Sequence, residues 1–153
     1  MGGYKFREKI FLIRKALAWK FLTKAGWPIV FLSSLYRRTF ARHKRTFVVM
    51  GSFGKTTTAR AVRAVLGLPP SLWTELNANH MGEIGWAFLK EHPWYSHAVV
   101  EIGASLPGRL SRYVRALHPN AIIMTSLGRE HLLTFKTIEA LRREKTEGLK
   151  MLP

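Results

Sequence analysis

The spacing of hydrophobic and polar residues divides the chain into two parts near residue 46. Over residues 4–24, apolar side chains recur every three or four positions, which is typical of an amphipathic helix. The apolar positions of this pattern are Phe6, Ile10, Ile13, Leu17 and Phe21. A short apolar segment over residues 29–36 and a basic run over residues 37–45 follow. We therefore expect a basic amphipathic helical segment over residues 1–45.

From residue 46 onward, short apolar runs alternate with helical patterns. The expected strands are residues 46–50, 97–102 and 121–125. The expected helices are residues 55–66, a helix beginning near Gly85, residues 107–117 and residues 137–150, with a loop over residues 71–86. Strands that alternate with helices form parallel sheets with right-handed crossovers. The pattern therefore predicts an α/β domain over residues 46–153, with a parallel sheet and helices on both faces.

Charge is unevenly distributed along the 153 residues, whose formal net charge is +16. Residues 1–46 hold twelve Lys and Arg but only one acidic residue, Glu8, so 12 − 1 gives a net charge of +11. Such a segment favours an anionic partner, either a lipid surface or a nucleic acid. Because the chain has no cysteine, disulfides, thiolate metal sites and cysteine nucleophiles are excluded.

The aromatic residues of the N-terminal segment favour lipid as its partner. Trp and Phe combined with Lys and Arg on an amphipathic helix are typical of the membrane interface. The longest uncharged apolar stretch, residues 25–36, is shorter than the roughly 20 residues of a spanning helix. No secretory signal is evident, so we expect a cytoplasmic protein that binds the inner membrane face peripherally. Nucleic acid is the weaker alternative because no recognised binding motif accompanies the charge. A solvated helical face, or packing against further domains, also fits the pattern.

A glycine-rich segment between the first predicted strand and the next helix predicts a phosphate-binding loop. Its residues are Gly51, Ser52, Phe53, Gly54, Lys55, Thr56 and Thr57. Small residues let backbone N–H groups approach phosphate oxygens, and the helix N-terminus adds partial positive charge. Lys55 can neutralise the terminal phosphates and Thr56 can ligate Mg²⁺. The alternative is an ordinary glycine turn before a helix. The sheet is therefore expected to be of the P-loop NTPase type.

This loop is shorter than the usual P-loop, because Gly51 lies only three positions before Gly54. In this it resembles the Mur ligase family, which joins amino acids or peptides to a carboxylate through an acyl phosphate. Four further stretches match that family in order: Asn77-Ala-Asn79 with Glu83-Ile84-Gly85, residues 99–104 with Pro107-Gly108, residues 125–128 with Glu130-His131-Leu132, and Glu144-Lys145-Thr146-Glu147. Two features depart from the family. Ser126 stands where it has asparagine, and residues 1–45 replace its UDP-sugar domain.

The resemblance implies roles for residues beyond the loop. Glu101 would be a magnesium ligand, and His131 would contact metal beside the γ-phosphate. Lys145 would be carbamylated and support the metal, while Asn77 and Asn79 would contact substrate. Each residue also has a simpler interpretation. Glu101 could be a strand-end carboxylate in solvent, His131 a solvated loop residue, Lys145 a lysine reaching solvent, and the asparagines turn residues.

Lys145 is also singled out by the pattern of the last predicted helix. An apolar stripe on that helix consists of Ile138, Leu141, Leu149 and Leu152. Lys145 falls on this stripe, four residues from Leu141 and four from Leu149. A lysine that faces inward must extend its ammonium to solvent, pair with another group or be modified.

Together these features predict the ATP- and Mg²⁺-binding part of an ATP-dependent amide ligase. ATP would phosphorylate a carboxylate, and an amine would then attack the acyl phosphate. The matching stretches look closest to family members that join a UDP-muramoyl peptide to a dipeptide in peptidoglycan precursor synthesis. The family's central domain would extend past residue 153, so we expect a partial domain that is not a competent ligase alone. The alternatives are a membrane-associated P-loop module and a poly-γ-glutamate-type ligase, whose N-terminal layout residues 1–45 resemble.

Overall fold

The computed structural model describes residues 26–71, 81–103, 106–129, 131–150 and 152. The helix predicted over residues 4–24 lies outside the described residues, as do Asn77, Asn79 and Glu130.

The centre of the fold is a parallel sheet of three strands in the order β2-β1-β3. These strands are β1 (Arg45–Met50), β2 (His97–Glu101) and β3 (Ala121–Met124). Val48 of β1 is opposite Val100 on one side and Ile122 on the other. Because helices cover both faces of β1, its last three residues are buried, which explains their continuous apolar run. The predicted strands and the α/β class are confirmed.

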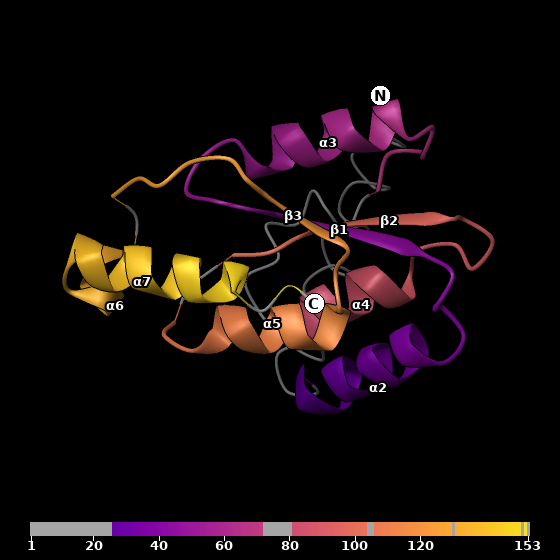
Figure 1. The fold of residues 1–153 in the computed structure, drawn as a ribbon, viewed down its shortest axis with the longest axis horizontal. Helices are drawn as coiled ribbons and strands as arrows, with labels where there is room; N and C mark the ends of the chain where they lie inside the picture. Colours follow the sequence, from indigo (N-terminus) through magenta and orange to yellow (C-terminus); the bar gives the residue numbers. More distant parts are fainter. Residues whose placement is uncertain (1–25, 72–80, 104–105, 130, 151, 153) are drawn as a thin grey trace, which may run out of the picture.

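Helices cover the two faces of the sheet unequally (Figure 1). Helix α3 (Lys55–Val65) lies on one face, where it contacts β1 and β2. Helices α4 (Met81–Leu89) and α5 (Arg109–Leu117) lie on the other face. Helix α7 (Ile138–Leu149) packs against α5 and follows the short helix α6 (Leu132–Phe135). The larger hydrophobic core therefore lies on the α4–α5 side of the sheet, and a smaller one lies beneath α3.

Helix α2 (Gly26–Arg38) adds a further layer beyond α4 and α5. Pro28 is accommodated in its first turn, where a missing backbone N–H leaves no hydrogen bond broken. A methyl group at Gly85 of α4 would lie 3.1 Å from both Cγ2 and the carbonyl oxygen of Ile29. Glycine at this position therefore lets the two helices approach closely. The apolar segment expected over residues 29–36 is helical and packs on the α/β unit.

Two residues of the predicted basic run are buried inside the fold. Arg37 donates to the carbonyl oxygens of Ala41 (2.9 Å) and Leu117 (3.2 Å). The Lys44 ammonium donates to the carbonyl oxygens of His92 and Tyr95, the latter at 2.8 Å. Burial lowers the pKa of both side chains. Hydrogen bonds from these two basic side chains therefore fix the segment between α2 and β1.

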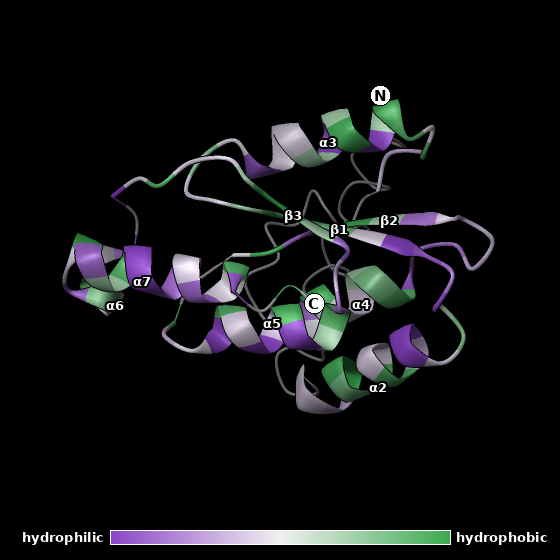
Figure 2. Cartoon of the chain, in the orientation of Figure 1, coloured by the Kyte–Doolittle hydropathy of each residue, from purple (hydrophilic) through white to green (hydrophobic). Residues whose placement is uncertain are grey.

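Hydropathy follows the layers of the fold, with hydrophobic residues along β1 and β3 and on the helices beneath them (Figure 2). Within the described part of the chain, no helix combines the length and the apolar character needed to cross a bilayer.

Candidate nucleotide and metal site

The predicted phosphate loop joins the end of β1 to the start of α3, and two of its residues must be glycine. Gly51 has φ 146° and Gly54 has φ 78°, a range that other residues rarely adopt. A Cβ atom at Gly51 would lie 2.0 Å from Oγ1 of Thr125 and 2.9 Å from the amide nitrogen of Ser126. The loop therefore packs directly on the segment that follows β3.

Hydrogen bonds with Thr125 and Ser126 fix the conformation of the phosphate loop. The Ser52 amide donates to the Ser126 carbonyl (3.0 Å), and the Phe53 amide donates to the Ser126 hydroxyl (2.9 Å). The Thr125 hydroxyl donates to the Phe53 carbonyl at 2.6 Å. Ser126, where the sequence departs from the family's asparagine, thus holds the loop through its hydroxyl group.

Lys55 is the first residue of α3, so its ammonium lies where positive charge already accumulates. The backbone N–H groups of the first helical turn lack helical partners and form the positive end of the helix dipole. The Lys55 ammonium donates to the carbonyl oxygens of Gly51 (2.9 Å) and Ser52 (3.1 Å). These contacts keep the charge beside the loop, which is the arrangement that binds phosphate groups.

Glu101 provides a buried carboxylate next to this loop. It ends β2 opposite Val49, and only 2% of its surface is exposed. Its Oε2 accepts a hydrogen bond from the Thr56 hydroxyl at 2.9 Å. Burial raises the pKa of Glu101, while that hydrogen bond and the charges of Lys55 and Arg60 oppose the rise. The interpretation of Glu101 as a solvated strand-end residue is therefore wrong.

The Thr56–Glu101 pair fits a magnesium ion. Hydroxyl and carboxylate oxygens are the ligands that Mg²⁺ takes in nucleotide sites, usually with water and phosphate oxygens completing the shell. A buried carboxylate is costly unless positive charge lies nearby, and a divalent cation supplies it.

His131 lies in the segment between β3 and α6. It is exposed and has a left-handed backbone conformation, with φ 53°. Its carbonyl oxygen accepts from the amides of Thr134 (2.9 Å) and Phe135 (3.0 Å), so its backbone begins α6. The described residues contain no group of three or more His, Asp or Glu that could hold a metal ion. The metal contact of His131 stays a prediction.

Lys145 faces inward, as the apolar stripe of the last helix predicts. Leu141, Lys145 and Gly148 form the buried face of α7, and only 1% of the lysine surface is exposed. Its ammonium donates to the hydroxyl oxygen of Ser52 at 2.7 Å. The interpretation of a lysine that reaches solvent is therefore wrong. Instead, the side chain joins α7 to the phosphate loop.

The supporting contacts of two residues, Ser52 and Glu144, were not identified from the sequence. The Ser52 hydroxyl also accepts from the Gly128 amide (2.7 Å), so it connects the loop, α7 and the segment after β3. Glu144 accepts hydrogen bonds from the amides of Gly108 (2.7 Å) and Leu110 (3.0 Å) and thereby caps α5. The N-cap residue of α5, Gly108, has no side chain, and this was the one signal that an outside acceptor is needed.

A three-stranded parallel sheet whose central strand runs through a glycine loop into a helix defines a P-loop-type α/β unit. The sequence matches the description "Mur ligase middle domain" over residues 49–153, and the chain belongs to this family.

Curated relatives and solved structures agree with that assignment. The chain is 29% identical over 110 residues to the UDP-N-acetylmuramoyl-tripeptide–D-alanyl-D-alanine ligase of Escherichia coli K12, covering 71% of this chain and 24% of that protein. The Bacillus subtilis ligase of the same name is 32% identical over 110 residues, covering 69% and 24%. A crystal structure of MurF from Acinetobacter baumannii superposes with a TM-score of 0.75 at 25% identity, covering 84% of this chain and 28% of that one. The chain thus spans about a quarter of the length of the relatives it matches.

Proposed function

We propose that this chain is the nucleotide-binding part of an ATP-dependent ligase that forms carbon–nitrogen bonds. The observation that carries the proposal is the Thr56–Glu101 hydrogen bond beside Lys55, in a chain of the Mur ligase middle domain family. In the reaction, ATP phosphorylates a carboxylate, and an amine displaces phosphate from the acyl phosphate to give an amide, ADP and phosphate.

Different residues of the chain would bind the phosphate groups and the metal ion. Backbone N–H groups of the loop and the Lys55 ammonium would bind the phosphate oxygens of ATP and stabilise charge on the transferring group. Thr56 and Glu101 would hold Mg²⁺, with His131 as the further contact that the family resemblance implies. Bound Mg²⁺ would neutralise the charge of the phosphate oxygens during transfer.

The names of the relatives suggest the substrates. We propose a UDP-muramoyl tripeptide as the carboxylate and D-alanyl-D-alanine as the amine, with Asn77 and Asn79 as substrate contacts. A poly-γ-glutamate-type ligase is the second candidate, favoured by the basic segment that precedes the loop. The third is a P-loop module that switches on nucleotide exchange or hydrolysis.

Product analysis separates these candidates. The chain is incubated with ATP and Mg²⁺, with and without bicarbonate, the tripeptide and the dipeptide, and both ADP and the amide are measured by mass spectrometry. As a partial domain, the chain should bind Mg·ATP but should not form the amide over many turnovers. Sustained ATP hydrolysis that needs neither the carboxylate nor the amine contradicts the ligase proposal and favours the switch. Failure to bind Mg·ATP overturns both.

We also propose that CO₂ carbamylates Lys145, whose buried ammonium lies against the phosphate loop. The neutral amine attacks CO₂ and loses one proton, which leaves an anionic carbamate able to support Mg²⁺. Carbon NMR of the protein in ¹³C-bicarbonate should show a carbamate signal, and Lys145→Gln should lack it. The same spectrum in both proteins would contradict this role.

Finally, we propose that the basic segment over residues 1–45 holds the protein peripherally at the inner face of the membrane. The support is the charge of residues 1–46, which is 12 − 1 = +11. Vesicles of phosphatidylglycerol should sediment the chain at low salt. Sedimentation should decline as salt rises, because the screening length shortens from about 10 Å at 0.1 M to about 3 Å at 1 M. Equal sedimentation with neutral vesicles would contradict the electrostatic basis.

A further inference from the structure

Helix α2 has apolar residues on both of its faces. Its inner face, which includes Ile29 and Val30, packs against α4 and α5. Its outer face and the turn that follows carry large exposed hydrophobic side chains, which we call the α2 outer face: Trp27, Phe31, Leu32, Leu35 and Phe40. Phe31, near the middle, is 68% exposed. Hydrophobic positions on α2 are visible in Figure 2.

A cluster of this kind indicates a binding surface. Single exposed hydrophobic residues are common, but contiguous apolar patches on a soluble domain mark interaction sites. In the described part of the chain, five of the twelve large hydrophobic residues that are exposed fall within residues 27–40. Three of them, at positions 27, 31 and 35, are spaced by one helical turn and so form a stripe.

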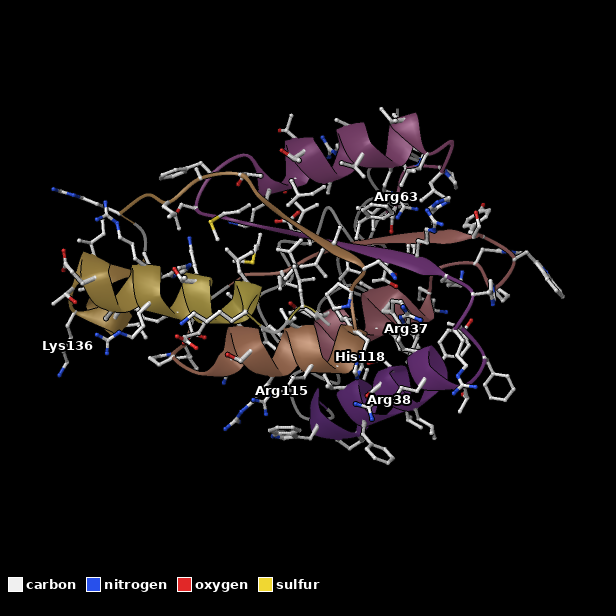
Figure 3. The ribbon with its side chains drawn as sticks, viewed as in Figure 1. Arg37, Arg38, Arg63, Arg115, His118 and Lys136 are labelled. Carbon is white, nitrogen blue, oxygen red and sulfur yellow. The ribbon has the colours of Figure 1, made fainter. Side chains whose placement is uncertain are left out.

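The border of this surface is uniformly basic. Arg38 and Arg42 follow the stripe, and α5 adds Arg112 and Arg115, all exposed. The guanidinium carbon of Arg112 lies 5.5 Å from the centre of the Trp27 ring. Figure 3 shows Arg38 and Arg115 on the side of the molecule where α2 lies. Neither residues 26–45 nor α5 contains an acidic residue.

These charges discriminate between the partners that an apolar face could take. Two copies of the chain meeting through this face would bring arginines of like sign together, which opposes association. An anionic lipid surface matches both features, since aromatic rings insert at the headgroup boundary while arginines contact phosphates.

The position of α2 is compatible with nucleotide binding. It lies on the opposite side of the sheet from α3 (Figure 1), and it leads into the amino end of β1. The phosphate loop follows the carboxyl end of the same strand. A surface that covers α2 therefore leaves the loop accessible.

We infer that the α2 outer face, bordered by Arg112 and Arg115 of α5, is the surface that docks on an anionic membrane. This inference rests on the proposed membrane association and assigns it to a face of the folded domain, in addition to the charge of the N-terminal segment.

The absence of cysteine makes a labelling test direct. Phe31→Cys and Val65→Cys are each prepared in the full chain and labelled with an environment-sensitive fluorophore. Val65 is the matched control because it is 87% exposed but lies on α3, across the sheet. With phosphatidylglycerol vesicles, emission at position 31 should rise at least about twofold and shift to the blue, because docked side chains enter the headgroup boundary. Position 65 should not respond.

The alternative results are distinguishable. If vesicles sediment the chain but position 31 stays silent, or both positions respond alike, the α2 inference is wrong and membrane association stands. If vesicles do not sediment the chain, both are wrong. A response at position 31 that depends on protein concentration without vesicles shows that a second copy covers the face, which also overturns the inference.

A charge variant gives an independent readout. Arg112→Gln combined with Arg115→Gln should weaken vesicle partitioning by about thirtyfold, from the typical contribution of two basic residues at an anionic surface. The control variant combines Lys136→Gln with Lys150→Gln. It removes the same charge from residues before and after α7, and it should change partitioning less. Equal losses in the two variants would show that net charge, and not this face, determines binding.

Discussion

Lys55 is held beside the phosphate loop by its own hydrogen bonds. Its ammonium contacts two loop carbonyl oxygens, and the loop itself is fixed by Thr125 and Ser126. A preorganised cation needs little rearrangement when an anion arrives, so the binding free energy is not spent on ordering the side chain.

We expect Lys55→Ala to weaken Mg·ATP binding by about a hundredfold or more, because charge-assisted hydrogen bonds to phosphate are lost. The fold should persist, since the hydrogen bonds that the ammonium donates go to carbonyl oxygens of the loop itself. Titration calorimetry measures the affinity, and Lys90→Ala on the surface is the control. Equal affinities of the Lys55 variant and the wild type would refute the assignment of the loop.

Removing the charge of Glu101 should preserve or raise the stability of the fold but weaken metal binding. Its burial makes the ionised form unfavourable, while the Thr56 hydrogen bond needs only an acceptor oxygen. Glu101→Gln retains that acceptor and removes the charge. The variant should therefore unfold at equal or higher urea concentration without ligand, and it should need more Mg²⁺ for ATP binding. A variant that loses stability but keeps the Mg²⁺ requirement would contradict the role of Glu101 as a ligand.

At the level of elements, α5 depends on a cap from a different helix. Gly108 provides no side chain, and Glu144 of α7 satisfies two amides of the first turn and places negative charge at the positive end of the helix. Capping of this kind couples the position of α7, which carries Lys145, to that of α5.

Glu144→Ala should lower the free energy of unfolding by about 1–2 kcal/mol, the usual cost of losing an N-terminal cap. Glu147→Ala is the matched control. Glu147 is one turn away and forms an exposed ion pair with Lys150, so its loss should cost less than about 1 kcal/mol. Urea denaturation followed by circular dichroism gives both values. A larger loss for Glu147→Ala than for Glu144→Ala would rule out the capping role.

The elements could be predicted from the sequence where a local pattern determines them. The three strands are apolar runs that end near glycine or a polar residue, and the stripe on α7 placed Lys145 inward. Helix α6 was missed because four residues are too few to show a period. The cap by Glu144 was also missed, since its partners are at least 34 residues away and only the tertiary fold brings them together.

The same distinction applies to the candidate site. The phosphate loop is a contiguous motif, so its position could be predicted directly. The contacts of Ser52, Thr125 and Ser126 join segments more than 70 residues apart, and no spacing rule reveals them.

At the scale of the whole molecule, hydrogen bonds between α2 and the end of α5 attach α2 to the α/β unit. Arg37 crosses from α2 to the carbonyl oxygens of Leu117 and His118 at the end of α5, and to the side chain of Asn120. The domain boundary at residue 45 stays a prediction. A protein that begins at residue 46 would lose these bonds, which is why the membrane tests use the full chain.

His118 makes this junction sensitive to pH. It ends α5 in a left-handed conformation, and Arg38 of α2 donates to its Nε2 at 2.7 Å. Since arginine is always a donor, this bond requires a neutral ring. Burial, Arg38 and Arg37 all lower the pKa of His118 below its ordinary value of 6.5. The folded protein therefore binds fewer protons here than the unfolded chain, and stability is lost as the pH falls below about 6.5 toward the lowered pKa.

We expect the free energy of unfolding to decrease between about pH 7.5 and about pH 5.5, in part because protonation of His118 breaks the bond from Arg38. His118→Asn is the informative variant, because asparagine tolerates the left-handed conformation and keeps an acceptor oxygen without titrating. Urea denaturation at both pH values measures the decrease in each protein. Glu101 titrates in both proteins, so the difference between the two decreases isolates His118. An equal decrease in the variant would show that the attachment of α2 does not depend on the charge of this residue.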